Sequence, residues 1–185
     1  MGLSLLVAQD PFVLDSAGTG SITQSIANSI QIADANNDGY NDIILSGYDP
    51  TRFGLFIDVM LGSSDGTLSQ GYQTYFVTYS DTIAEYLGGI GNISLADVNL
   101  DGSIDIYLNG SAQSELLFNS ASGSFSESSW LQNMRVTYSN GKWGDVNMDG
   151  APDLFLMGVN ESTDQILNKL FINNGSSFEN DLTTI

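Results

Sequence analysis

A single nine-residue pattern, D-x-N-x-D-G-x-x-D, occurs three times in this chain of 185 residues. Each copy places side-chain oxygens at positions 1, 3, 5 and 9, and the glycine at position 6 permits the sharp turn that directs them inward. Three carboxylates crowded into one turn repel one another unless a cation lies among them. A ligand set made only of oxygens suits Ca²⁺, which takes roughly six to eight of them.

The sequence therefore predicts three calcium loops, each completed by the backbone carbonyl of the variable position 7. The predicted ligands are Asp34, Asn36, Asp38, Tyr40 and Asp42 in the first loop, Asp97, Asn99, Asp101, Ser103 and Asp105 in the second, and Asp145, Asn147, Asp149, Ala151 and Asp153 in the third. The alternative is a metal-free polar turn, because Asp, Asn and Gly favour turns without any ion. That alternative does not explain why Asp returns at positions 1, 5 and 9 in every copy.

The residues after each loop distinguish between two kinds of calcium-binding structure. A helix–loop–helix hand needs a bidentate Glu at position 12, and this chain has Leu45, Leu108 and Leu156 there. Each loop is instead followed by a short apolar run that ends at a glycine, as in Asp105-Ile-Tyr-Leu-Asn-Gly110. Runs of this length between turn residues predict strands buried on both faces. We therefore expect each loop to join two strands.

The repetition extends beyond the loops, which start 63 and 48 residues apart. Each loop and its strand are followed by a second hairpin signal, such as Leu170-Phe-Ile-Asn-Asn-Gly-Ser-Ser-Phe178. Each unit then holds four short antiparallel strands in about 50 residues, which is the content of a propeller blade. The segment from Leu5 to Phe12 resembles the outer hairpin of such a blade.

The predicted fold class is all-β, namely a β-propeller or partial propeller of about three four-stranded blades plus an N-terminal half-blade hairpin. The chain is predicted to be a single repeat domain over residues 1–185. Its expected parts are the half-blade hairpin over 1–20 and three repeats over 21–80, 81–138 and 139–185.

From about Ser21 onward the chain resembles the FG-GAP/VCBS repeats of integrin α-subunit propellers and of many bacterial and algal surface proteins. The resemblance rests on the three loops, the small residue before each loop, the glycine after each following strand, and the Asn/Gly…Phe hairpins. The small residues are Ala33, Ala96 and Gly144, and the glycines are Gly47, Gly110 and Gly158. It implies that each loop joins the first two strands of a blade and binds one Ca²⁺ at the positions named above.

Composition excludes several classes of function. The formal net charge is −18, with only four Lys and Arg residues, which argues against nucleic acid or an anionic membrane as a partner. Nine of the 22 acidic residues lie in the loops, so three bound Ca²⁺ ions would bring the charge from −18 to −12. The chain has no Cys and no His, which excludes thiol chemistry and His-based catalysis. No stretch approaches the length of a membrane span, so we expect no membrane insertion.

The remaining acidic residues show no repeated or paired spacing, so we expect no enzyme and no catalytic residues. The first alternative is a module that binds a carbohydrate or a protein ligand, with the aromatic segment from Tyr72 to Tyr86 as a platform for sugar rings. Ordinary strand packing explains these aromatics better, as it does for Trp130 and Trp143. A polysaccharide lyase or hydrolase is the less favoured alternative.

We therefore predict a calcium-stabilised extracellular or cell-surface protein with a structural or adhesive role. A partial propeller leaves open strand edges at both ends, and open edges invite pairing. The expected partners are further copies of this chain, in a filament or surface array, or another extracellular protein, with a glycan as the alternative. Four Asn-x-Ser/Thr sequons, at Asn92, Asn109, Asn160 and Asn174, fit surface turns of a secreted protein.

Overall fold

The computed structural model describes residues 26–49, 54–77, 92–110, 114–131, 136–160 and 162–180. Within these ranges the chain forms twelve strands and no helix. The strands build three four-stranded antiparallel sheets, and each sheet uses four consecutive strands in sequence order. The all-β prediction and the prediction of four antiparallel strands per repeat are therefore confirmed. The predicted half-blade hairpin over 1–20 lies outside the described residues.

The first sheet contains β1 (Ile26–Ala33), β2 (Asp42–Asp49), β3 (Gly54–Gly62) and β4 (Leu68–Val77). The middle sheet contains β5 (Asn92–Ala96), β6 (Asp105–Asn109), β7 (Glu115–Asn119) and β8 (Phe125–Glu127). The third sheet contains β9 (Val136–Gly144), β10 (Asp153–Asn160), β11 (Gln165–Asn173) and β12 (Phe178–Asn180). In each sheet the predicted calcium loop connects the first strand to the second.

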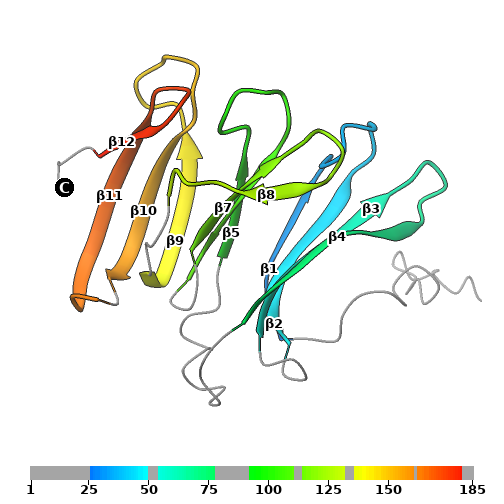
Figure 1. The fold of residues 1–185 in the computed structure, drawn as a ribbon, viewed down its shortest axis with the longest axis horizontal. Helices are drawn as coiled ribbons and strands as arrows, with labels where there is room; N and C mark the ends of the chain where they lie inside the picture. The colour runs from blue at the N-terminus through cyan, green and yellow to red at the C-terminus, as the bar shows by residue number, and fades with distance from the viewer. Residues whose placement is uncertain are drawn as a thin grey trace, which may run out of the picture.

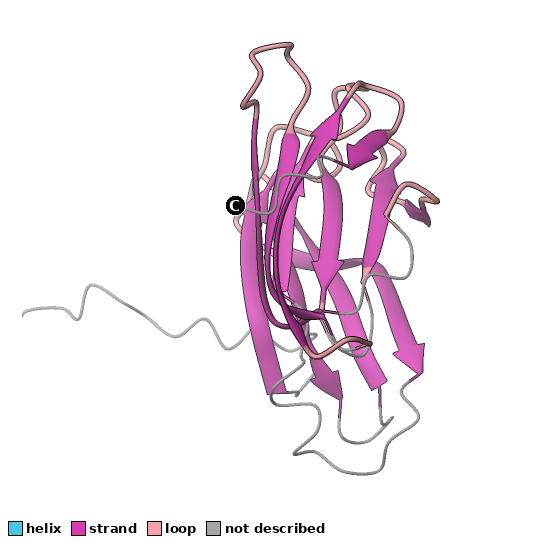
Figure 2. Ribbon diagram, turned by 90° about the vertical axis from the view of Figure 1, so that its left-hand side faces the viewer, coloured by secondary structure: helices cyan, strands magenta, loops and turns pink. Residues whose placement is uncertain are grey.

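The three sheets stack face to face in chain order, and Figure 1 shows them fanned out side by side. Figure 2, turned by 90°, shows the stack along its own direction, with the strands of successive sheets overlapping. The first strands of neighbouring sheets lie close together, β1 beside β5 and β5 beside β9. As a result, all three predicted calcium loops lie at the same end of the stack, at the top of Figure 1.

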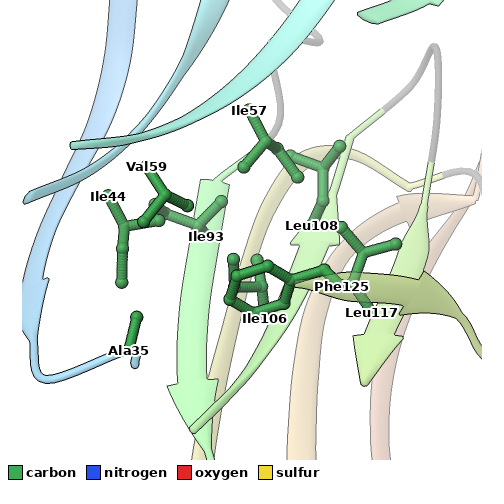
Figure 3. Packing of buried hydrophobic residues seen from close by; sticks show 9 residues of the cluster. All are labelled: Ala35, Ile44, Ile57, Val59, Ile93, Ile106, Leu108, Leu117 and Phe125. Carbon is green, nitrogen blue, oxygen red and sulfur yellow. The ribbon is translucent and has the colours of Figure 1, made fainter. Parts of the chain in front are cut away.

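Two apolar cores join the sheets. The first core lies between the first and middle sheets and is drawn in Figure 3; its buried members are Ala35, Ile44, Ile57, Val59, Ile93, Ile106, Leu108, Leu117 and Phe125. The second core joins the middle and third sheets through Val98, Tyr107, Leu116, Leu131, Val136, Leu154, Leu156, Leu167 and Phe171. Because alternate residues of a strand point to opposite faces, the middle sheet contributes Ile106 to the first core and Tyr107 to the second.

Burial of the strand after each loop differs among the three sheets. β2 and β6 are buried on both faces, as predicted. The same prediction is wrong for β10, because Leu154 and Leu156 are buried against the middle sheet whereas Met157 is exposed on the opposite face. The physical reason is that no described sheet covers the far face of the third sheet.

Candidate metal centre

The three predicted calcium loops adopt one backbone conformation. Position 4 is left-handed in every loop, with φ of 58° at Asn37, 60° at Leu100 and 62° at Met148. The glycines at position 6 have φ between 88° and 94°, a region in which glycine has no steric penalty. A left-handed residue other than glycine costs about 1 kcal/mol. Asn tolerates this region, so the second and third loops bear the cost at Leu100 and Met148 while the first avoids it with Asn37.

Within each loop the oxygens of positions 1 and 3 meet at one backbone N–H. In the second loop the N–H of Asp101 donates to Asp97 Oδ1 and to Asn99 Oδ1, both at 3.0 Å. The N–H of Gly102 donates to Asp97 Oδ2 at 2.9 Å, and Asn99 Nδ2 donates to Asp101 Oδ2 at 2.9 Å. The first and third loops repeat all four contacts. Positions 1, 3 and 5 are therefore brought together by the fold.

The aspartate at position 9 has a different environment, because it begins the second strand of its sheet and is buried. One carboxylate oxygen accepts the N–H of position 2, as in Val98 N–H to Asp105 Oδ2 at 2.8 Å. The other accepts an N–H at the end of the third strand, as in Asn119 N–H to Asp105 Oδ1 at 2.9 Å. Asp42 and Asp153 make the same two contacts. This carboxylate thus fastens the loop to two strands of its own sheet.

Burial of this carboxylate changes its acidity in the middle sheet. Burial raises the pKa of the Asp105 carboxyl to about 6, although N–H donation from Asn119 and Val98 lowers it. The negative charge of Asp101 also raises this pKa. The upward direction of the pKa shift is mainly that of a carboxyl group removed from water, with a smaller contribution from the nearby negative charge.

The described residues contain no group of three or more acidic side chains already gathered as a metal site. The carboxylate of position 9 points into its sheet, while those of positions 1 and 5 bind backbone N–H groups of the loop. The donor chemistry nevertheless fits Ca²⁺. Every predicted ligand atom is an oxygen, and a carboxylate that accepts one N–H at each oxygen retains further lone pairs.

Position 7 differs among the loops in side chain but not in backbone contact. The N–H of Tyr40, Ser103 and Ala151 donates in each case to the position 5 carboxylate, at 2.9 Å. Tyr40 is exposed, whereas Ser103 and Ala151 are buried. That only the carbonyl of this position would contribute to an ion stays a prediction.

Neighbouring loops are connected by two asparagines that the sequence analysis did not identify. Asn119, the last residue of β7, donates from Nδ2 to the Ala35 carbonyl in the first loop at 2.6 Å. Asn173, the last residue of β11, donates from Nδ2 to the Val98 carbonyl in the second loop at 2.8 Å. Each asparagine also gives its backbone N–H to the position 9 aspartate of its own sheet. The sequence does carry a signal for them: β7 and β11, the third strands of the middle and third sheets, both end in Asn.

The aromatic side chains that can be placed act in packing. Tyr72 packs against Phe125 with ring centroids 5.1 Å apart, while Tyr79 and Tyr86 lie outside the described residues. Trp130 contacts Phe118 and Phe178 edge-on, at 5.0 and 5.9 Å. Trp143 lies 6.0 Å from Tyr107, edge-on, and 6.0 Å from Phe178. The packing role predicted for the two tryptophans is confirmed.

One of the sequons does not lie at the surface. Asn109 ends β6 and is only 1 % exposed, so the expected surface turn is wrong there. The physical reason is that its strand lies between two sheets. Asn174 is exposed, in the turn between β11 and β12.

Residues 97–156 match the FG-GAP-like repeat, and no curated protein matches the chain. The matched region begins at position 1 of the second loop and includes all of the third loop. Repeats of this type are typically extracellular and typically serve as structural or binding modules rather than enzymes. Among the described residues there is no helix that could cross a membrane. The segment from Asp97 to Leu156, which contains two of the three loops, is therefore similar to an FG-GAP-like repeat.

Proposed function

We propose that this protein is a calcium-stabilised structural module of β-propeller type that serves adhesion or assembly outside the cell. The observation that supports the proposal most strongly is the threefold recurrence of one loop geometry. The ligands would be the side chains of positions 1, 3, 5 and 9 and the carbonyl of position 7. Bound Ca²⁺ would neutralise carboxylates that otherwise repel one another.

The chain's own residues explain how such a site would stabilise the fold. The position 9 aspartate connects the loop, the second strand and the end of the third strand through two N–H bonds. Asn119 and Asn173 then connect the first and second loops to the following sheets. A change that orders a loop therefore acts on the strands of its own sheet and, for the first and second loops, also on the following sheet.

Thermal unfolding in Ca²⁺, in Mg²⁺ and in excess chelator tests this proposal. At a Ca²⁺ concentration about 100-fold above the dissociation constant, each site adds about 2.7 kcal/mol to stability. We expect Asp97→Asn and Asp145→Asn each to lose one such increment, because each removes one carboxylate charge at position 1. Asp164→Asn is the matched control, since Asp164 lies in an exposed turn with φ of 53°, a conformation that Asn tolerates.

Equal unfolding temperatures in Ca²⁺ and in chelator would contradict the proposal. Equal losses in the loop variants and in Asp164→Asn would also contradict it, because they would reflect net charge rather than a site. Preference for Ca²⁺ over Mg²⁺ is expected, because Mg²⁺ gives up its water reluctantly and demands a stricter geometry.

A further inference from the structure

The three loops differ in what lies against them. The Ala35 carbonyl of the first loop accepts a hydrogen bond from Asn119 of the middle sheet. The Val98 carbonyl of the second loop accepts one from Asn173 of the third sheet. Val146 holds the same position in the third loop and is 57 % exposed, whereas Ala35 and Val98 are fully buried. Within the described part of the chain, the support that a following sheet gives to the first two loops is therefore missing from the third.

Packing against the turns of the following sheet repeats this difference. In the first loop Asn36 lies against Gly123, in the turn between β7 and β8, where a Cβ would lie 3.4 Å from the Cβ of Asn36. In the second loop Leu100 lies against Gly175, in the turn between β11 and β12, where a Cβ would lie 3.7 Å from Leu100 Cδ1. Met148 holds the position of Leu100 in the third loop and is 90 % exposed. The first two loops are thus held on their side chains as well as on their backbone.

The predicted ligands at positions 1 and 3 follow the same division between loops. They are half-buried in the first and second loops and exposed in the third; the half-buried residues are Asp34, Asn36, Asp97 and Asn99, and the exposed ones are Asp145 and Asn147. Hydrogen bonds within the loops do not account for this difference, because all three loops make the same four contacts. The difference comes from the neighbouring sheet.

Two physical effects make a supported loop the better calcium site. A loop that its neighbour already holds in place loses less conformational freedom when an ion binds, so less of the binding free energy is spent on ordering it. A carboxylate that is partly removed from water also attracts a cation more strongly, because the effective dielectric constant around it is lower. Both effects favour the first and second loops over the third.

We propose that this chain holds two tight calcium sites, in the first and second loops, and one weak site in the third loop. Asn119 and Asn173 are positioning residues, because each acts on an ion through the loop carbonyl that it binds in the preceding sheet. This inference rests on the proposed calcium-dependent role and specifies its regulation. Occupancy of the third loop would follow the Ca²⁺ concentration over a range in which the other two loops stay filled. Because coupling is reciprocal, an ion in the first or second loop also strengthens the contact with the following sheet.

Calorimetric titration of the full chain with Ca²⁺, after removal of ions with chelator, tests the order of affinities. We expect two ions in a tight class and one ion that binds at least about tenfold more weakly, which is equivalent to about 1.4 kcal/mol. Asp145→Asn should remove the weak ion and leave both tight ions in place. Asp97→Asn should remove one tight ion and leave the weak ion.

Alanine variants of the two asparagines test the positioning role loop by loop. Asn119→Ala should weaken one tight ion about fivefold, as expected for the loss of one hydrogen bond, and leave the weak ion unchanged. In the Asp97→Asn background, which lacks the second site, Asn119→Ala should still weaken the remaining tight ion whereas Asn173→Ala should not. A role in packing alone would not produce this dependence on the loop. Asn140→Ala, at an exposed position of β9, is the matched control and should keep the wild-type affinities.

Three ions of equal affinity would overturn this inference and leave the proposed function intact. Loss of a tight ion in Asp145→Asn would also overturn it, because the third loop would then be a tight site. Unchanged tight ions in both asparagine variants would overturn the positioning role. A wild-type chain that binds no Ca²⁺ would reject the proposed function as well. The titrations of the wild type and of Asp145→Asn decide the order of affinities even if an asparagine variant does not fold.

Discussion

Replacement of Asn173 by alanine tests whether the asparagine contacts hold neighbouring sheets together. The Asn173 side chain is fully buried and makes three hydrogen bonds. Nδ2 donates to the Val98 carbonyl at 2.8 Å and to the Pro152 carbonyl at 3.2 Å, and Oδ1 accepts the Gly175 N–H at 2.9 Å. Each such bond contributes about 1 kcal/mol net, so Asn173→Ala should lower the free energy of unfolding by about 3 kcal/mol.

Asn119 provides an internal comparison. Its Nδ2 donates to the Ala35 and Ile104 carbonyls, while its Oδ1 has no partner among the described residues. Asn119→Ala should therefore cost about 2 kcal/mol, about 1 kcal/mol less than Asn173→Ala. The backbone N–H groups of both residues remain, so the bonds to Asp105 and Asp153 are kept.

Urea unfolding in saturating Ca²⁺ measures both values. With a slope of about 2 kcal/mol per molar urea, the midpoint should fall by about 1.5 M for Asn173→Ala and by about 1 M for Asn119→Ala. Midpoints within about 0.25 M of the wild type, equivalent to about 0.5 kcal/mol, would refute the reasoning. A larger loss at Asn119 than at Asn173 would refute the count of hydrogen bonds on which it depends.

Three further substitutions have defined outcomes. Gly62→Ala should lower the free energy of unfolding by about 1–3 kcal/mol, because a Cβ there would lie 2.2 Å from the Asn41 carbonyl oxygen. Gly144→Ala is the control: a Cβ at Gly144 meets open space, so the urea midpoint should not change. Met148→Asn should raise the free energy of unfolding by about 0.5–1 kcal/mol, because Asn tolerates the left-handed backbone of this residue and the 90 % exposed Met148 side chain packs on little. An unchanged urea midpoint would contradict strain at this position. Trp130→Ala should lose about 2 kcal/mol through its ring contacts to the middle and third sheets, and wild-type stability would contradict its packing role.

The repeated pattern was sufficient to predict the local structure. D-x-N-x-D-G-x-x-D followed by an apolar run specifies a turn and a strand through local preferences, and three copies specify three equivalent sheets. The resemblance to FG-GAP repeats agrees with the match over residues 97–156. The closed or partial ring of the predicted propeller is a property of the arrangement of sheets, which local patterns do not determine.

Contacts between distant segments could not be predicted. Asn119 and Ala35 are 84 residues apart, and no local pattern identifies them as partners. The sequence assigned Asp105 only to an ion, whereas the structure shows that it also accepts two backbone N–H groups within its own sheet. The exposure of Met157 could not be predicted from the sequence either. The run Leu154-Phe-Leu-Met157 has the same apolar pattern as the runs whose strands are covered on both faces.

The number of Ca²⁺ ions bound per chain tests the central claim most directly. Equilibrium dialysis of the full chain after removal of ions with chelator measures it without reference to stability. The account predicts three ions for the wild type and two for Asp97→Asn, with Asp164→Asn unchanged at three. A wild-type chain that binds no Ca²⁺ would contradict the account, and so would a loss of the same size in Asp164→Asn.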